Sequence, residues 1–131
     1  MKHTHRPCIL TVEDNDHTRQ LVSYWLKDTF DVQMATNPDE ALSIAENRSF
    51  DLLMLDINLG RGHNGVDLLH ELRKQPALSR TPALAFTAYA MPSDQKRLLE
   101  EGFTHYISKP FTKAELHEAI DAALSRASLA A

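Results

Sequence analysis

Polar residues that could carry out chemistry follow directly after short apolar runs at several points along this chain. They are Glu13, Asp14, Asp56, Thr87 and Lys109. A carboxylate can act as a nucleophile toward phosphorus and so form an aspartyl phosphate. Such a reaction requires a metal ion and a lysine to neutralise the phosphoryl oxygens, and a hydroxyl donor to complete the cradle. The set therefore contains every part needed for phosphoryl transfer to an aspartate.

The apolar run Leu-Leu-Met-Leu at 52–55 ends in Asp56 and gives the clearest indication of how these side chains are positioned. A run without polar alternation is typical of a strand buried on both faces, as in a parallel sheet. Open α/β sheets place their chemistry at the carboxyl ends of such strands. For Asp56 or Asp14 alone, capping of the next element is the simpler interpretation, so the choice depends on the rest of the chain.

Strand and helix patterns alternate five times along the 131 residues. Besides the strand at 52–56, we predict strands at 8–12, 31–36, 81–87 and 103–107. We predict helices at 15–27, 37–45, 66–72, 91–99 and 112–124, followed by a frayed tail of small residues. Asn37 and Thr112 are expected to cap two of these helices. Short crossovers of this kind produce a parallel sheet with helices on both faces. The predicted fold class is therefore α/β, a flavodoxin-like doubly wound (βα)5 with a five-stranded parallel sheet in the order 2-1-3-4-5.

The predicted topology brings the polar residues to one edge of the sheet, because all parallel strands end on the same side. In the order 2-1-3-4-5 the first and third strands are neighbours, so Glu13, Asp14 and Asp56 are expected to share one crevice. Carboxylates this close oppose each other's ionisation. A shared hard divalent cation such as Mg²⁺ would relieve that repulsion.

Composition excludes several function classes. Lys and Arg number 14 and Asp and Glu 18, and this net charge of -4 argues against direct binding of nucleic acid. The single cysteine excludes an internal disulfide and fits a reducing compartment. No apolar stretch is long enough to cross a bilayer, and no long apolar region follows the basic start of the chain. We therefore expect a cytoplasmic protein with no membrane partner, forming a single domain over residues 1–131.

Four short motifs, in this order, resemble those of the receiver domains of two-component response regulators. They are Val-Glu-Asp-Asn at 12–15, Leu-Asp-Ile-Asn at 55–58, Thr-Ala-Tyr at 87–89 and Lys-Pro-Phe at 109–111. Each motif alone is common, but all four at the ends of predicted strands are specific. The resemblance covers about residues 7–126.

The resemblance implies that Asp56 accepts a phosphoryl group from a histidine kinase or a histidine phosphotransfer protein, with Mg²⁺ or Mn²⁺ as cofactor. It implies that Asp56 and Asp14 bind the metal directly, that Glu13 acts through water, and that Asn58 offers its backbone carbonyl. Lys109 would pair with Asp56 and then with the phosphate, and the Lys109–Pro110 bond would be cis.

The resemblance also implies a signalling domain rather than an enzyme, although one that assists its own phosphorylation and dephosphorylation. Thr87 and Tyr106 would form a switch that reshapes the face made by the fourth helix, the fifth strand and the fifth helix. That face would contact a downstream protein target, or a second copy in a phosphorylation-dependent homodimer. For Tyr106, a plain role as a half-buried core aromatic is the alternative.

The chain departs from the family's pattern after the predicted acceptor. Gly60 stands where the family often has proline, and the loop to Gly65 is one residue longer than the commonest form. We expect this loop to be more mobile for that reason. We also hypothesise that Tyr89 partly shields the acyl phosphate from water.

Two other functions compete with phosphorylation-dependent signalling. A phosphohydrolase working through an aspartyl phosphate would usually carry a second acid two residues after the nucleophile, where this chain has Asn58. A receiver-like binding scaffold that is never phosphorylated is disfavoured by the intact set of polar residues. The sequence leaves open the cognate kinase, the output target, the oligomeric state and the lifetime of the phosphoryl group. Met1 and the short tail favour a free-standing regulator over a receiver from a hybrid kinase.

Overall fold

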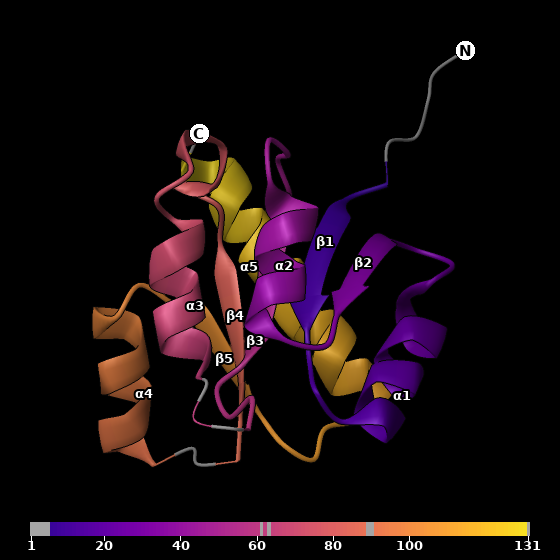
Figure 1. Ribbon diagram of the computed structural model, residues 1–131. Helices are drawn as coiled ribbons and strands as arrows, with labels where there is room; N and C mark the ends of the chain where they lie inside the picture. Colours follow the sequence, from indigo (N-terminus) through magenta and orange to yellow (C-terminus); the bar gives the residue numbers. More distant parts are fainter. Residues whose placement is uncertain (1–5, 61, 63, 89–90, 131) are drawn as a thin grey trace.

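The computed structural model describes residues 6–60, 62, 64–88 and 91–130, with the backbone alone over 126–130. Five strands alternate with α-helices along these residues (Figure 1). The strands are β1 (Cys8–Val12), β2 (Asp31–Ala35), β3 (Leu52–Asp56), β4 (Ala83–Thr87) and β5 (His105–Ser108). The helices are α1 (Asp16–Leu26), α2 (Pro38–Ala45), α3 (Gly65–Leu72), α4 (Pro92–Glu100) and α5 (Lys113–Ala130), and a 3₁₀ turn, η1, covers Pro76–Leu78.

The strands form one parallel sheet in the order β2-β1-β3-β4-β5, which confirms the predicted flavodoxin-like fold. β2 lies at one edge, as its alternating sequence predicted. Val12 pairs with Leu55 across β1 and β3, and Asp56 pairs with Phe86 across β3 and β4. The carboxyl ends of the central strands are therefore level with one another.

Helices cover both faces of the sheet and create two hydrophobic cores. One core packs α2, α3 and α4 against the sheet, and the other packs α1 and α5 against the opposite face. In Figure 1, α2 and α3 lie in front of the sheet and α5 lies behind it. Leu53 and Leu55 of β3 belong to the first core, whereas Leu52 and Met54 belong to the second. β3 is thus buried on both faces, as its unbroken apolar run predicted.

Side-chain caps fix where the helices begin. Asn37 Oδ1 accepts a hydrogen bond from the Glu40 amide at 2.8 Å. Thr112 and Glu115 form a reciprocal capping box, with N–O distances of 2.9 and 3.1 Å. Both predicted caps are therefore confirmed. α1 is capped by Asn15, whose Oδ1 accepts from the Thr18 amide at 2.8 Å, so the preceding acid is not the cap.

Most boundaries differ by no more than two residues from the sequence predictions, as at β4, which begins at Ala83 rather than at residue 81, and two differences have a clear physical reason. β5 begins at His105 rather than at residue 103, because Gly102 turns the chain at a φ of 112° and Phe103 packs into the core just after it. α5 continues to Ala130 instead of fraying after Leu124, in line with the high helix propensity of alanine. None of the described helices combines the length and the apolar character that crossing a membrane would require.

Candidate functional site

The carboxyl ends of β1, β3 and β4 and the segment after β5 meet at one cleft of about 410 Å³. All the residues singled out at the strand ends line it. They are Glu13, Asp14, Asp56, Asn58, Thr87 and Lys109, and Asn15, Ile57, Gly60 and Ala88 complete the lining. The level ends of the parallel strands explain why residues so distant in sequence meet here.

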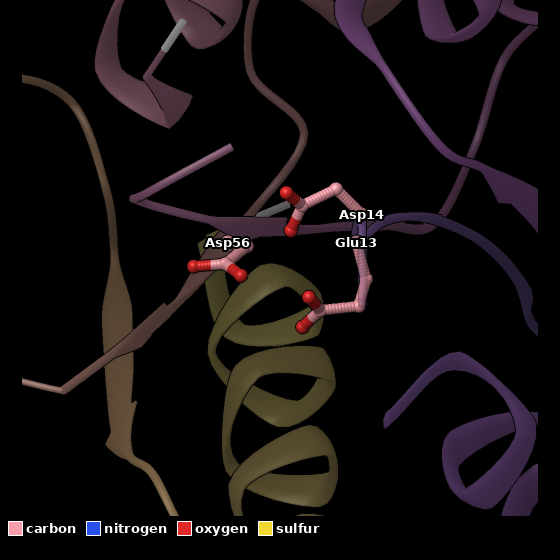
Figure 2. Close-up of side chains that lie close together, drawn as sticks. All are labelled: Glu13, Asp14 and Asp56. Atoms are coloured by element: carbon pink, nitrogen blue, oxygen red, sulfur yellow. The ribbon is translucent and has the colours of Figure 1, made fainter. Parts of the chain in front are cut away.

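Three carboxylates face a common space in this cleft (Figure 2). One oxygen from each of Glu13, Asp14 and Asp56 lies within 4.8 Å of the others. Glu13 is fully buried and Asp56 is 5% exposed, whereas Asp14 lies open to solvent. Such a cluster of hard oxygen donors with one open side fits a divalent cation that keeps part of its water shell.

Lys109 bridges the two buried carboxylates. Its Nζ donates to Asp56 Oδ2 at 2.8 Å and to Glu13 Oε1 at 2.7 Å. Burial alone would lower the pKa of Lys109, but its hydrogen bonds to Asp56 and Glu13 outweigh burial and raise that pKa overall. Lys109 is therefore a firmly charged ammonium group. The Lys109–Pro110 bond is cis, as predicted, and the Lys109 amide donates to the Thr87 carbonyl at 2.8 Å.

Glu13 has an unusual protonation equilibrium. Burial is the main cause that raises its pKa to about 7, and the hydrogen bond from Lys109 opposes this rise. The neighbouring Asp56 raises the pKa further, whereas the hydrogen bond that Glu13 Oε2 accepts from the Asn15 amide at 3.0 Å lowers it. Burial and the neighbouring carboxylate thus outweigh the contact with Lys109, and the cluster holds three acids against this one lysine.

The loop after β3 holds the other oxygen of Asp56. Asp56 Oδ1 accepts from the Asn58 amide at 3.0 Å, and the Gly65 amide donates to the Ile57 carbonyl at 2.9 Å. A Cβ at position 65 would lie 2.4 Å from the Asp56 carbonyl oxygen, so only glycine fits there. From the sequence, Gly65 was assigned only to the loop. Its position directly before a helical pattern could have indicated a tight backbone contact at the start of that helix.

The two predicted switch residues lie on adjoining strands. Thr87 is 4% exposed and lines both the cleft and a neighbouring groove of about 350 Å³ between α3 and α4. Tyr106 is half-buried against the core, and its hydroxyl donates to Gln95 Oε1 of α4 at 2.8 Å. Tyr106 therefore joins β5 to α4. Tyr89, proposed as a shield, lies outside the described residues.

A comparison with known protein families decides the identity of this fold and cleft. The family model of the response regulator receiver domain matches residues 9–121. The chain belongs to this family.

Similar receiver domains occur alone and within longer proteins. The phosphate regulon regulatory protein PhoB of Rhizobium meliloti is 36% identical over 122 residues, which are 92% of this chain but 53% of PhoB. Chemotaxis response regulator CheY4 of Vibrio cholerae superposes with a TM-score of 0.85 at 28% identity, covering 92% of this chain and all of CheY4. The receiver domain of the sensor histidine kinase PA1611 from Pseudomonas aeruginosa gives a TM-score of 0.81 at 28% identity, over 92% and 99% of the two chains. That structure holds a magnesium ion in its active-site cleft.

These comparisons confirm the resemblance drawn from the four motifs. They place the chain among signalling domains of two-component systems, whose members here include both response regulators and a histidine kinase.

Proposed function

We propose that this chain is a single receiver domain that takes a phosphoryl group onto Asp56 from a phosphohistidine of a histidine kinase or histidine phosphotransfer protein. The observation that carries the proposal is the contact of the nearly buried Asp56 carboxylate with Lys109, inside a cluster of three carboxylates. In the reaction a carboxylate oxygen of Asp56 forms a bond to phosphorus. The phosphorus–nitrogen bond of the donor breaks, and the donor imidazole retains the electron pair and is protonated.

Asp14 and Asp56 would bind Mg²⁺ or Mn²⁺ directly, Glu13 would act through water, and Asn58 would contribute its backbone carbonyl. The charges support this assignment, because three carboxylates share one lysine in the cleft. When bound, the cation would neutralise charge on the phosphoryl oxygens. Lys109 would pair first with the Asp56 carboxylate and then with a phosphoryl oxygen. The Asn58 amide would orient Asp56.

The donor would cover an apolar groove of about 450 Å³ beside the cleft, between α1 and the segment after β5. Leu21, Trp25 and Phe111 line this groove, and Lys109 lines both the groove and the cleft. A protein seated on this surface would bring a phosphohistidine within reach of Asp56.

The output would be a change in the face formed by α4, β5 and α5. Thr87 would move toward the phosphoryl group, and the hydrogen bond between Tyr106 and Gln95 would then rearrange. A downstream protein, or a second copy in a phosphorylation-dependent homodimer, would read the changed face. The domain would thus bias a two-state surface through a local change of charge.

Phosphorylation can be tested with a small phosphodonor such as acetyl phosphate in the presence of Mg²⁺, followed by intact mass. We expect the gain of one phosphoryl group, its loss after chelation of Mg²⁺ before the reaction, and no gain in Asp56→Asn. A gain that survives Asp56→Asn, or no gain in the unaltered protein, would refute the assignment. Asn58, where a phosphohydrolase would carry a second acid, favours signalling over hydrolysis.

A further inference from the structure

Gly60 makes an unusually close approach to the carboxylate of Asp14. Its φ is 73°, in the left-handed region that proline cannot adopt and other L-residues adopt at a cost. A Cβ at this position would lie 3.0 Å from Asp14 Oδ2, a few tenths of an ångström inside ordinary contact. Gly60 therefore has a specific neighbour, which is a residue of the acidic cluster.

The position of Gly60 is tied back to Asp56 through Asn58. The Gly60 amide donates to Asn58 Oδ1 at 3.2 Å, and the Asn58 amide donates to Asp56 Oδ1 at 3.0 Å. Asn58 also forms a bridge to Asn64 across the loop, which closes the loop at its base. These contacts connect the orientation of Asp56 with the place where the backbone meets Asp14.

The Asp14 side chain is exposed to solvent and is less constrained than the other two acids. Glu13 is held by Lys109 and the Asn15 amide, and Asp56 by Lys109 and the Asn58 amide. Among the described residues, the Asp14 carboxylate is held by no comparable hydrogen bond. The Cβ that position 60 lacks would lie 3.0 Å from Asp14 Oδ2, so Gly60 leaves room for this carboxylate near the other two acids.

We propose that Gly60 is a positioning residue of the metal site, and that the absence of a Cβ there lets Asp14 lie where it can share a cation with Asp56. This inference rests on the proposed function, because it assumes that the cluster binds Mg²⁺ or Mn²⁺. An added methyl group would displace the Asp14 carboxylate from its present place near Asp56. The affinity for the metal would fall without loss of the fold.

Gly62 provides a matched control within the same loop. Its φ is 79°, close to that of Gly60, but a Cβ there would meet nothing within 4 Å. Alanine at either position would impose a similar backbone cost. Only Gly60→Ala adds the contact with Asp14, so a difference between the two variants isolates that contact.

The test is a titration of the metal-free protein with Mn²⁺, followed by the electron paramagnetic resonance signal of the unbound ion, with Mg²⁺ as competitor and no phosphodonor. We expect Gly60→Ala to weaken Mn²⁺ binding on the order of ten-fold, as is typical when the support of a metal ligand is lost. Gly62→Ala should remain within about two-fold of the unaltered protein. Circular dichroism melting checks that both variants are folded.

A second variant keeps the proposal testable if Gly60→Ala does not fold. Asn58→Ala retains Gly60 and the backbone carbonyl at position 58 but removes the acceptor of the Gly60 amide, and it should weaken Mn²⁺ binding several-fold. The proposal would be overturned if Gly60→Ala and Gly62→Ala lost equal Mn²⁺ affinity. It would also be overturned if Gly60→Ala or Asn58→Ala bound Mn²⁺ as tightly as the unaltered protein. In both cases the metal site itself would still stand. Absence of Mn²⁺ binding by the unaltered protein would instead overturn the metal step of the proposed function, and this inference with it.

Discussion

Replacing Lys109 with methionine should destabilise the metal-free protein, by an amount that depends on pH. The lysine contacts Glu13, which is fully buried, and Asp56, which is 5% exposed. Removing one partner of a buried ion pair costs about 3–5 kcal/mol. Because 24% of the Lys109 side chain is exposed, we expect the lower end, about 3 kcal/mol at pH 8.

The pH dependence follows from Glu13. Its pKa is raised from 4.5 to about 7 in the folded protein, chiefly by burial. A carboxyl group with a raised pKa stabilises the fold fully below its unfolded value, near 4.5, and this contribution is lost as the pH rises through about 7. Without Lys109 the pKa of Glu13 should rise further. At pH 5 Glu13 is therefore protonated in both proteins, and the substitution then removes mainly the contact of Lys109 with Asp56, so its cost should fall to about 2 kcal/mol.

Urea unfolding in the presence of a chelator, at pH 5 and at pH 8, measures both values. Lys113→Met, which changes an exposed lysine at the start of α5, is the control and should be neutral at both pH values. Adding Mg²⁺ at pH 8 should restore part of the lost stability, because the cation would take over the charge balance of the cluster. An equal loss at both pH values, or a loss no greater than that of the control at pH 8, would refute this account of the cleft.

Three further substitutions test the framework around the cleft, each by urea unfolding. Gly65→Ala should cost about 2–3 kcal/mol, because its Cβ would lie 2.4 Å from the Asp56 carbonyl oxygen; a neutral result would contradict that close approach. Arg73→Met should cost about 3 kcal/mol, because the guanidinium donates to the carbonyls of Leu78, Thr81 and Gly102 at 2.6–3.0 Å; a loss under about 1 kcal/mol would mean that water replaces it. Tyr106→Phe should cost about 1 kcal/mol and speed amide hydrogen exchange in α4, since it removes the bond to Gln95; unchanged exchange would argue against this link.

The sequence was sufficient for the fold because each element carried its own evidence. The unbroken apolar run of β3 required burial on both faces, and the alternation of strands with helices required parallel neighbours. Once the strands are parallel, Glu13, Asp56 and Thr87 must end at the same edge. The meeting of these residues in one cleft was therefore predictable from topology alone.

The finer geometry of the cleft was not predictable, because it depends on distances that sequence patterns do not encode. Two adjacent acids at a strand end point in different directions, and the pattern does not say which one is buried. In the structure Glu13 is buried against Lys109 and Asp14 is exposed against Gly60. The left-handed conformation of Gly60 and the tight fit of Gly65 likewise depend on how the loop closes over Asp56.

The double contact of Lys109 bears on what happens when Asp56 carries a phosphoryl group, as we propose. Phosphorylation removes the negative charge from the Asp56 carboxyl group and places charge on the phosphoryl oxygens. A lysine that contacted Asp56 alone would lose its only ion pair when Asp56 is phosphorylated. Lys109 is also held by Glu13 at 2.7 Å, so it can turn from the carboxylate to a phosphoryl oxygen while its other contact persists. Full burial of Glu13 keeps water from replacing that contact.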